Sequence, residues 1–302
     1  MGKVVLIACT NVGRAMIEAI KNSPALSGVE LSGVVDLKPE AAVDKANYDA
    51  YTDLVKKYSL NIYYCEDVNE PECVDFIKGC APDIIIQSGW SQKFKQELLS
   101  IPKYACIGEH PAPLPKGRGA ACINWAIITG EREWGDTFFK MEMQYDTGLI
   151  YAQEHFVIED YDDVKTVYDK VAASSVAAIK KHLLDWTEGK LDGKVQDDSK
   201  ATHYPRRRPS DGEFSFDRPA KDVYDHIRGQ ARPYPGAFFN AKLDGVMKKI
   251  YVWRAAYNRA SDVYPEGYSI KCSDGKDIIL LRVQPEGETE IWGAEIRNRL
   301  EL

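Results

Sequence analysis

The sequence lacks several features that would assign it to other classes of protein. Its 302 residues contain no apolar run near the roughly 20 residues of a membrane span, and the start, MGKVVLIACTNVG, lacks the long apolar core and cleavage site of a signal peptide. Its seven cysteines include no CxxC pair, so neither a disulfide framework nor a zinc site is indicated. We therefore expect a cytoplasmic protein with reduced thiols, no membrane partner and no metal.

Positive charge is also scarce relative to negative charge. The chain has 39 Lys and Arg against 46 Asp and Glu, which gives a net charge of −7 and a pI of about 5.4. Binding to nucleic acid requires concentrated Lys and Arg, so we expect no nucleic-acid partner. The hydrophobic content of 44% is normal for a globular protein, and the length suggests about two domains.

Strand-like and helix-like segments alternate through the first 90 residues. We expect strands at 3–9, 29–36, 61–67 and 82–89, and helices at 12–23, 39–59 and 70–81. In the first helix, Val12, Met16 and Ile20 fall on one face. The strand PDIIIQSG is apolar without alternation, as in a strand buried on both faces. This order predicts an α/β fold with a Rossmann-like, doubly wound parallel sheet.

Ligands of such sheets bind beyond the carboxyl ends of the strands. That edge would hold Thr10-Asn11, the segment QSGW at 87–90, and the segment GEHP at 108–111. Prolines at 111, 113 and 115 fix the backbone after His110 and predict an ordered, extended loop. The turn CTNVGRA carries one glycine in place of GxGxxG, so a dinucleotide site is excluded.

The segment 110–153 resembles the folate-dependent formyltransferases. The matching elements stand in order: His110, Leu114-Pro115, Arg118-Gly119, Trp125-Ala126-Ile127, Gly130-Glu131, Gly135, Thr137, Met141 and Asp146-Thr147-Gly148-Leu149-Ile150. Residues 204–239 look like the start of that family's smaller C-terminal domain, closest to the branch that acts on nucleotide-linked amino sugars. The resemblance implies a catalytic domain at 1–203, a linker at 204–212 and an open barrel-like domain at 213–302 that packs and could form a homodimer.

The resemblance also implies roles for particular residues. His110 would take the proton of an attacking amine or hold the developing negative charge, and Asp146 would orient its ring. The formyl donor would be 10-formyltetrahydrofolate. The folate would lie against Ser88, Gly89, Trp90, Met143, Gln144 and Tyr145, and the diphosphate of a nucleotide-linked sugar against Thr10, Asn11 and Arg118.

The sequence departs from the family pattern at one position. The family has an asparagine two residues before the histidine, where its amide stabilises an oxyanion, and here that residue is Gly108. We expect a loop backbone N–H at positive φ, a water, or the amide of Gln87 or Asn124 to replace it. Glu109 between them is expected to be a solvated loop residue.

Three functions remain open at this point. The chain would transfer a formyl group to a nucleotide-linked 4-amino-4,6-dideoxy sugar, or it would be a methionyl-tRNA formyltransferase. The second alternative is disfavoured because DLKPEAAVDKANYDAYTDLV replaces that enzyme's long basic loop after the second strand. A catalytically inactive folate-binding or regulatory module is the third alternative, suggested by Gly108.

Overall fold

The structure, a computed structural model, describes residues 1–43, 45–257 and 263–301. It divides into two compact units, each of which is described by itself. The first comprises residues 1–122, 133–157 and 168–204, and the second comprises 123–132, 158–167 and 205–302. The domain boundaries expected from the sequence remain a prediction; in the structure, two segments from within the expected first domain cluster with the C-terminal part.

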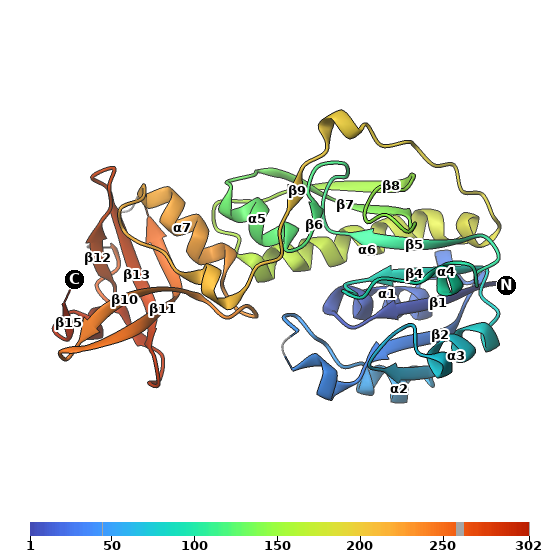
Figure 1. The fold of residues 1–302 in the computed structure, drawn as a ribbon, viewed down its shortest axis with the longest axis horizontal. Coiled ribbons are helices and arrows are strands. Elements are labelled where there is room, and N and C mark those ends of the chain that lie inside the picture. Colours follow the sequence, from blue (N-terminus) through green and yellow to red (C-terminus); the bar gives the residue numbers. More distant parts are fainter. Residues whose placement is uncertain (44, 258–262, 302) are drawn as a thin grey trace. The chain divides into compact units, whose positions relative to one another are not determined.

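The first unit is built on a sheet with the strand order β3-β2-β1-β4-β5-β7-β8 (Figure 1). Its parallel strands are β1 (Gly2–Ala8), β2 (Val29–Leu37), β3 (Ile62–Cys65), β4 (Ile84–Ser88) and β5 (Ala105–His110). The antiparallel strands β7 (Glu133–Lys140) and β8 (Ile150–Val157) complete the edge. The doubly wound parallel sheet is thus confirmed, and the antiparallel pair is an addition that the sequence did not predict.

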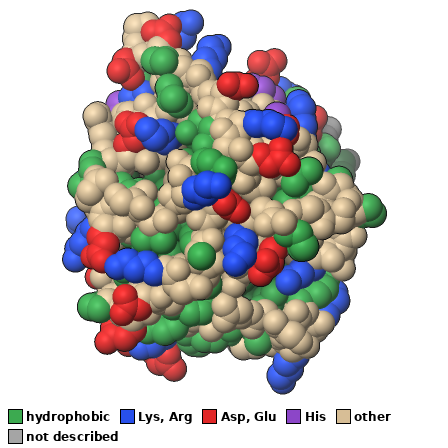
Figure 2. Space-filling model, turned by 90° about the vertical axis from the view of Figure 1, so that its right-hand side faces the viewer, with side chains coloured by type: hydrophobic (Ala, Val, Ile, Leu, Met, Phe, Trp, Pro, Cys, Tyr) green, Lys and Arg blue, Asp and Glu red, His purple; other side chains and the backbone are tan. Residues whose placement is uncertain are grey.

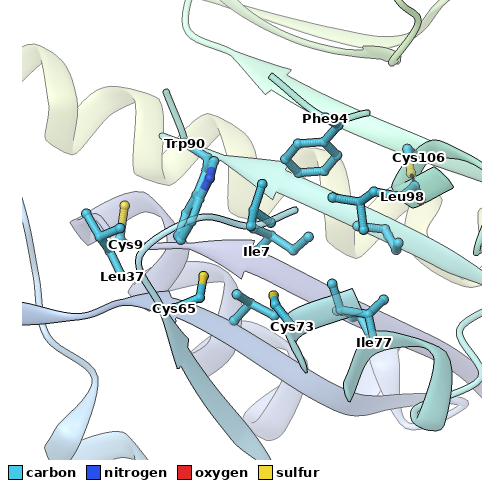
Figure 3. Packing of buried hydrophobic residues seen from close by; sticks show 14 of the residues in the cluster. Ile7, Cys9, Leu37, Cys65, Cys73, Ile77, Trp90, Phe94, Leu98 and Cys106 are labelled. Atoms are coloured by element: carbon cyan, nitrogen blue, oxygen red, sulfur yellow. Dashed lines mark hydrogen bonds between the residues drawn. The ribbon is translucent and has the colours of Figure 1, made fainter. Parts of the chain in front are cut away.

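Helices cover both faces of this sheet. Helices α1 (Asn11–Asn22) and α6 (Val164–Thr187) lie on one face, where Gly13 approaches Ala8 and Thr187 approaches Gly2. Helices α3 (Pro71–Gly79) and α4 (Gln96–Leu99) pack on the other, over a cluster that includes Ile7, Ile77 and Leu98. Figure 3 shows the thiols of four cysteines in this cluster. All seven cysteines are buried and free.

The helix expected at 39–59 is wrong in its extent. The structure has a short 3-10 helix, η2 (Pro39–Ala42), and helix α2 (Thr52–Tyr58), with an irregular segment between them; residue 44 of the expected helix lies outside the described residues. Arg14 explains the interruption, because its guanidinium binds Asp49, Asp53 and the carbonyl of Ala50. Tertiary ion pairs therefore override the helical propensity of this segment.

The second unit contains a curled antiparallel sheet with the order β12-β13-β11-β10-β15. Its strands are β10 (Ala237–Leu243), β11 (Val246–Tyr257), β12 (Tyr268–Lys271), β13 (Asp277–Pro285), β14 (Ile291–Trp292), which pairs with β13, and β15 (Leu300–Glu301). Helix α7 (Ala220–Gly229) packs Val223 and Ile227 into its core, and helix α8 (Gly293–Ile296) contributes Ile296. This sheet confirms the expected open barrel-like architecture.

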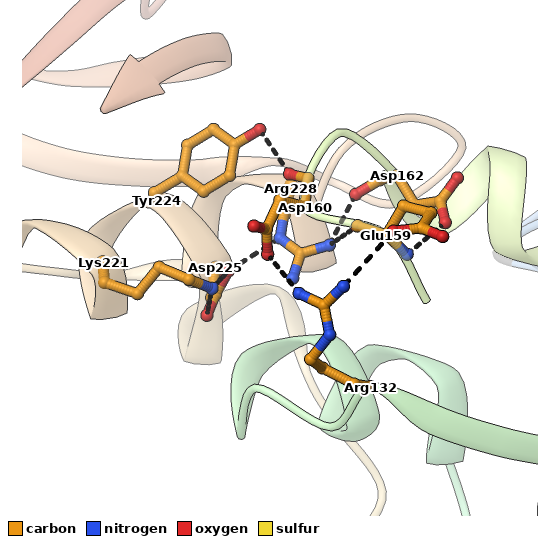
Figure 4. A network of polar contacts seen from close by, with 8 residues as sticks. All are labelled: Arg132, Glu159, Asp160, Asp162, Lys221, Tyr224, Asp225 and Arg228. Carbon is orange, nitrogen blue, oxygen red and sulfur yellow. Dashed lines mark hydrogen bonds and ion pairs between the residues drawn. The ribbon is translucent and has the colours of Figure 1, made fainter. Parts of the chain in front are cut away.

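A buried arginine, Arg228, joins helix α7 to one of the inserted segments of the second unit (Figure 4). Arg228 is 6% exposed; its Nε donates to Asp225, and its Nη1 donates to the carbonyl oxygens of Glu159 and Asp162. Arg132 pairs with Glu159 at the exposed side of the same cluster. Since a buried guanidinium needs partners for its N–H groups, this network fixes residues 158–162 against α7.

The remaining helices and strands are short. They are η1 (Pro24–Leu26), α5 (Cys122–Ile128), η3 (Asp198–Lys200), η4 (Pro209–Gly212) and the paired strands β6 (Arg118–Gly119) and β9 (His203–Tyr204). Within the described ranges, none of the helices has the length and apolar character that crossing a membrane would require.

Candidate active site

His110 is the last residue of strand β5 and lies at the carboxyl edge of the sheet, as the sequence predicted. Its side chain is 8% exposed, and Nε2 lies 2.8 Å from the carbonyl oxygen of Gly117. The thiol of Cys122, at the start of α5, contacts the same imidazole. The ring is therefore held by the loop that follows it.

The proline loop after His110 is tied down by two strands. Thr137 Oγ1 donates to the carbonyl of Ala112 at 2.6 Å and accepts from the N–H of Leu114 at 3.2 Å. Gln153 donates to the carbonyl of Leu114 and to Thr137 Oγ1. Because Thr137 belongs to β7 and Gln153 to β8, the antiparallel edge strands fix the position of the loop, and with it the acceptor at Gly117.

Asp146 lies in the turn between β7 and β8 and acts on His110 through its charge. Its φ is +57°, which few non-glycine residues adopt, although Asp and Asn tolerate it best. Its Oδ2 accepts a hydrogen bond from the N–H of Gly119 at 2.8 Å. The structure thus brings the two residues expected to be catalytic, His110 and Asp146, into one site within the first unit.

Arg118 and Gln196 hold this turn in place. Arg118 is 4% exposed, donates to Gln196 Oε1 at 2.8 Å, and pairs with Asp198 at 2.7 Å. Gln196 Nε2 in turn donates to the carbonyl oxygens of Asp146 and Gly148. Arg118 is therefore committed to the frame of the site and is not free to bind a diphosphate. Sequence reasoning missed Gln196, since no motif marks it.

The electrostatic surroundings of His110 favour its charged form. Burial alone would lower the pKa of the imidazole, but the Cys122 thiol, the Asp146 carboxylate and the Gly117 carbonyl oppose this and raise the pKa to about 10. His110 is therefore an imidazolium near neutral pH, better suited to stabilise negative charge than to accept a proton.

Glu109 is not a solvated loop residue, as the sequence had suggested. It lies inside β5, is 5% exposed, and accepts a hydrogen bond from Ser88 Oγ at 2.6 Å. Its side chain points to the α6 face, opposite to the neighbouring side chain of His110, because successive residues of a strand alternate. Burial raises the pKa of Glu109.

Gly108 does not present a free backbone N–H at positive φ, so that expectation is wrong. The residue lies in the interior of β5, paired with Gln87 of β4 and Phe139 of β7, and it is not among the glycines with positive φ. A Cβ at this position would lie 2.7 Å from the Phe139 ring and 3.1 Å from Met141 Cγ. The aromatic ring therefore occupies the space that an asparagine side chain would need.

The two amides considered as substitutes are both engaged elsewhere. Gln87 Nε2 donates to the carbonyl of Trp90 at 3.1 Å, and Asn124 Nδ2 donates to the carbonyl of Gly229 at 2.7 Å within the second unit. Neither amide is directed at His110 in these hydrogen bonds. The group near the expected position that carries positive charge is the imidazole of His110.

Thr10 and Asn11 lie where β1 passes into helix α1, beside the point at which the strand order reverses between β1 and β4. No side chain caps this helix and no acidic residue lies in its first turn. Thr10 Oγ1 is buried, and no described residue forms a hydrogen bond with it. The exposed N–H groups of such a helix end attract anions.

The two segments expected to hold the folate differ in their exposure. Ser88 is fully buried and bonded to Glu109, and Trp90 is 8% exposed and packed in the core, so their side chains face inward. Met143 and Tyr145 are 46% and 61% exposed, and Gln144 is also exposed. Lys93 lies over the Tyr145 ring at 5.5 Å, which brings the loop after β4 to the loop after β7.

A surface hollow elsewhere in the first unit does not belong to this site. It is lined by Lys21, Pro24 and Glu30 and lies at the opposite edge of the sheet, near the amino ends of β1 and β2. In the part of the chain that the structure describes, no group of three or more His, Cys, Asp or Glu side chains is placed to hold a metal ion.

Comparison with known sequences identifies relatives along nearly the whole chain. Residues 3–183 match the family described as Formyl transferase, and residues 207–300 match Formyl transferase, C-terminal domain. The methionyl-tRNA formyltransferase of Caldanaerobacter subterraneus subsp. tengcongensis is 32% identical over 255 residues, which cover 82% of this chain and 81% of that protein. That of Geotalea uraniireducens is 32% identical over 247 residues, or 80% of this chain and 78% of that protein.

Solved structures share the fold at lower identity. The N-formyltransferase of Helicobacter canadensis, in complex with folinic acid and dTDP-3-aminofucose, matches with a TM-score of 0.68 and 18% identity over 94% of this chain and 100% of that one. The methionyl-tRNA formyltransferase of Clostridium thermocellum matches with a TM-score of 0.59 and 17% identity over 94% and 98%. HypX of Aquifex aeolicus matches with a TM-score of 0.65 and 18% identity; the chain spans 48% of its length.

Proposed function

The chain belongs to the formyl transferase family and is therefore an enzyme that transfers formyl groups, and we propose that its acceptor is the amine of a nucleotide-linked amino sugar. The donor is 10-formyltetrahydrofolate, and the acceptor is a 4-amino-4,6-dideoxy sugar of the kind used in surface glycans. The observation that carries the proposal is the pairing of a buried, charged His110 with Asp146 at the carboxyl edge of the sheet.

His110 supplies the positive charge that the reaction needs. When the amine attacks the formyl carbon, the formyl oxygen becomes negatively charged, and a nearby imidazolium stabilises it. His110 acts on this oxygen through its positive charge, since its Nε2 is already bound to the Gly117 carbonyl. This charge offsets the loss of the amide that other family members carry at the position of Gly108.

Asp146 is the group that accepts the amine's proton. Its carboxyl is only partly buried and has one hydrogen bond, from the N–H of Gly119. As the C–N bond to the acceptor forms, a proton leaves the amine nitrogen. When the bond to the folate nitrogen breaks, that nitrogen gains a proton, so Asp146 and His110 can carry the proton between the two.

The folate is bound mainly by backbone groups on one side and by exposed side chains on the other. Ser88 and Trp90 direct their side chains inward, so the segment that also includes Gly89 offers its peptide groups. Met143, Gln144 and Tyr145 extend from the facing loop and cover the ring. Relatives of the same fold have been solved with tetrahydrofolate and with folinic acid, which supports this assignment.

The diphosphate of the acceptor binds at the start of α1. Asn11 and the residues after it offer peptide N–H groups there, and no carboxylate lies in the first turn of the helix. The N–H of Thr10 donates to the Tyr51 hydroxyl, and the Thr10 hydroxyl is buried behind this helix end. Arg118 takes no part, because its guanidinium is buried against Gln196 and Asp198. A related N-formyltransferase has been solved with dTDP-3-aminofucose, which supports an acceptor of this class.

Methionyl-tRNA is the second candidate acceptor, because relatives with 32% identity act on it. Two observations favour the sugar. The chain carries a net charge of −7, and on the face shown in Figure 2 positive and negative side chains are interspersed. Several basic residues of the C-terminal sheet also pair with acids: Lys248 and Arg299 with Glu288, and Arg282 with Glu290. A surface of this kind offers little to a polyanion.

One assay with two acceptors tests the proposal. The purified protein is incubated with 10-formyltetrahydrofolate and either a panel of UDP-, dTDP- and GDP-linked amino sugars or methionyl initiator tRNA, and release of tetrahydrofolate is measured. We expect turnover with at least one amino sugar and none with tRNA at physiological salt. Efficient formylation of the tRNA with no turnover of any sugar would establish the second candidate. His110→Ala serves as the background control.

A further inference from the structure

Two carboxyl groups lie side by side behind strand β5, on the α6 face of the sheet. Glu109 of β5 stands opposite Phe138 of β7, so Asp136, two residues earlier in β7, is its diagonal neighbour on the same face. Glu109 is 5% exposed and Asp136 is 1% exposed. The two carboxyl groups are close enough to interact with each other electrostatically.

The outer oxygen of each carboxyl is satisfied by a serine. Ser88 Oγ of β4 donates to Glu109 Oε2, and Ser175 Oγ of α6 donates to Asp136 Oδ2. No donor among the described residues reaches Glu109 Oε1 or Asp136 Oδ1. A hydrogen bond between two carboxyls needs a proton on one of them, and two carboxylates this close cannot both remain ionised in a buried site.

We propose that Glu109 and Asp136 are positioning residues that share one proton, and that their single negative charge favours the protonated form of His110. His110 follows Glu109 directly in β5, and each carboxyl interacts electrostatically with its ring. Burial raises the pKa of both acids, as the retention of one proton near neutral pH requires. The catalytic role of His110 belongs to the proposed function above; the acid pair itself does not depend on it.

Other groups contribute to the state of His110 and of the pair. The Cys122 thiol, Asp146 and the Gly117 carbonyl act on the imidazole from the loops around it. The largest charge effects on the pair include those of its own two members and of His110, while β4 and α6 present the hydroxyls of Ser88, Ser174 and Ser175. The acid pair therefore adds one negative charge near His110, from the opposite face of the sheet, to the charge of Asp146.

Replacing one or both carboxyl groups by amides tests whether the pair shares a proton and whether its negative charge acts on His110. In Glu109→Gln or Asp136→Asn, the new NH₂ group donates to the remaining carboxylate, so the charge of −1 is kept. In the double variant Glu109→Gln/Asp136→Asn, the charge is removed. The substitutions preserve side-chain size, and thermal melting checks that each variant folds. Glu133→Gln, an exposed change in the same strand β7, is the matched control.

The readout is the NMR titration of His110, which is one of five histidines and is assigned with a His110→Gln spectrum. We expect both single variants and Glu133→Gln to titrate like the wild type. The double variant should lower the pKa of His110 by about one unit, since one charge within roughly 10 Å changes such an equilibrium about tenfold. The pH profile of formyl transfer should shift in the same direction.

Three results would overturn the inference. An unchanged titration in the double variant means that the pair carries no net charge. A half-sized shift in each single variant means that both acids are ionised and share no proton. If one single variant already lowers the pKa of His110 by the full amount, that residue alone carries the negative charge and the proton is not shared. Because the titration needs no substrate, it decides the question even if no amino sugar is formylated.

Discussion

Gln196 donates a hydrogen bond to the carbonyl oxygen of Asp146 at 2.9 Å, although 50 residues separate the two in the sequence. The same amide nitrogen donates to Gly148, and the amide oxygen accepts from the buried Arg118. This clamp holds the Asp146 turn at a backbone φ of +57°. The direction in which the Asp146 carboxyl points, which we propose to be catalytic, therefore depends on a residue far outside the motif that contains it.

Gln196→Leu should remove the hydrogen bonds that hold the Asp146 turn in place. The variant removes the donor to two carbonyl oxygens and one acceptor of the Arg118 guanidinium, which keeps Asp198, so we expect turnover to fall about tenfold or more, with KM for the folate changed less than kcat. Steady-state kinetics and a thermal melt measure both effects. Asp198→Asn, whose side chain is 81% exposed, is the control and should retain most of the activity. If Gln196→Leu lowered the melting temperature without lowering kcat, Gln196 would only support the fold.

His110→Ala and Asp146→Asn should each lower formyl transfer by ~100-fold or more, because each removes a group that handles charge or protons at the reacting atoms. Asn tolerates positive φ nearly as well as Asp, so Asp146→Asn should keep the melting temperature near that of the native enzyme. Single-turnover measurements with saturating folate separate chemistry from binding. Near-native turnover in His110→Ala would require other residues in these roles.

Gly108→Asn should lose stability as well as activity. The new side chain would collide with the Phe139 ring, at 2.7 Å from its Cβ, and such overpacking costs about 1–3 kcal/mol. Denaturant unfolding measures the cost. Combined with Phe139→Ala, Gly108→Asn should cost less than the sum of the two separate changes, because the space is vacated, whereas its cost should add to that of Phe138→Ala, at the neighbouring position of β7. A stable and more active Gly108→Asn enzyme would contradict the geometry at this strand.

His226 should make the second unit sensitive to mild acid. Burial lowers its pKa to about 4, Arg207 and Arg218 add to this, and a hydrogen bond to the Gly212 carbonyl opposes it. Since the unfolded chain binds a proton below about pH 6.5 and the folded unit does not, the free energy of unfolding should fall by about 2 kcal/mol between pH 7 and pH 5. Urea unfolding followed by fluorescence measures it.

The matched variants for this prediction are His226→Gln and His203→Gln. His226→Gln should flatten the dependence of the unfolding free energy on pH in this range. His203 is exposed, so His203→Gln should leave that dependence as it is in the native protein. Identical slopes in all three proteins would mean that His226 is solvated when folded.

The sequence predicted the parallel strands β1 to β4 and the helices α1 and α3 because their hydrophobic patterns are local, whereas it did not predict β5. Val12, Met16 and Ile20 repeat on one face of α1 and are buried there. The irregular segment between Pro39 and Tyr58 could not be predicted in this way, since its shape depends on Arg14, which lies in another helix. Periodicity carries no information about such distant ion pairs.

Within the site, the motif residues His110 and Asp146 could be predicted, while their surroundings could not. Glu109 resembles a loop residue in the sequence, and only the pairing of β5 with β4 and β7 places it beside Ser88 and Asp136. Arg118 carries the charge that a phosphate site needs, but its partner Gln196 lies 78 residues away. These contacts follow from tertiary structure, and no short-range pattern signals them.

The pairing of β6 with β9 has a consequence for the order in which the enzyme matures. Arg118 N–H bonds to the carbonyl of Thr202, and Thr202 Oγ1 accepts from the N–H of Gly117, whose carbonyl holds His110. During synthesis, His110 and Asp146 leave the ribosome long before residues 196–204 do. The nascent chain therefore contains His110 and Asp146 before it contains residues 196–204, which hold them in position. The site is complete only when Tyr204 has emerged from the ribosome.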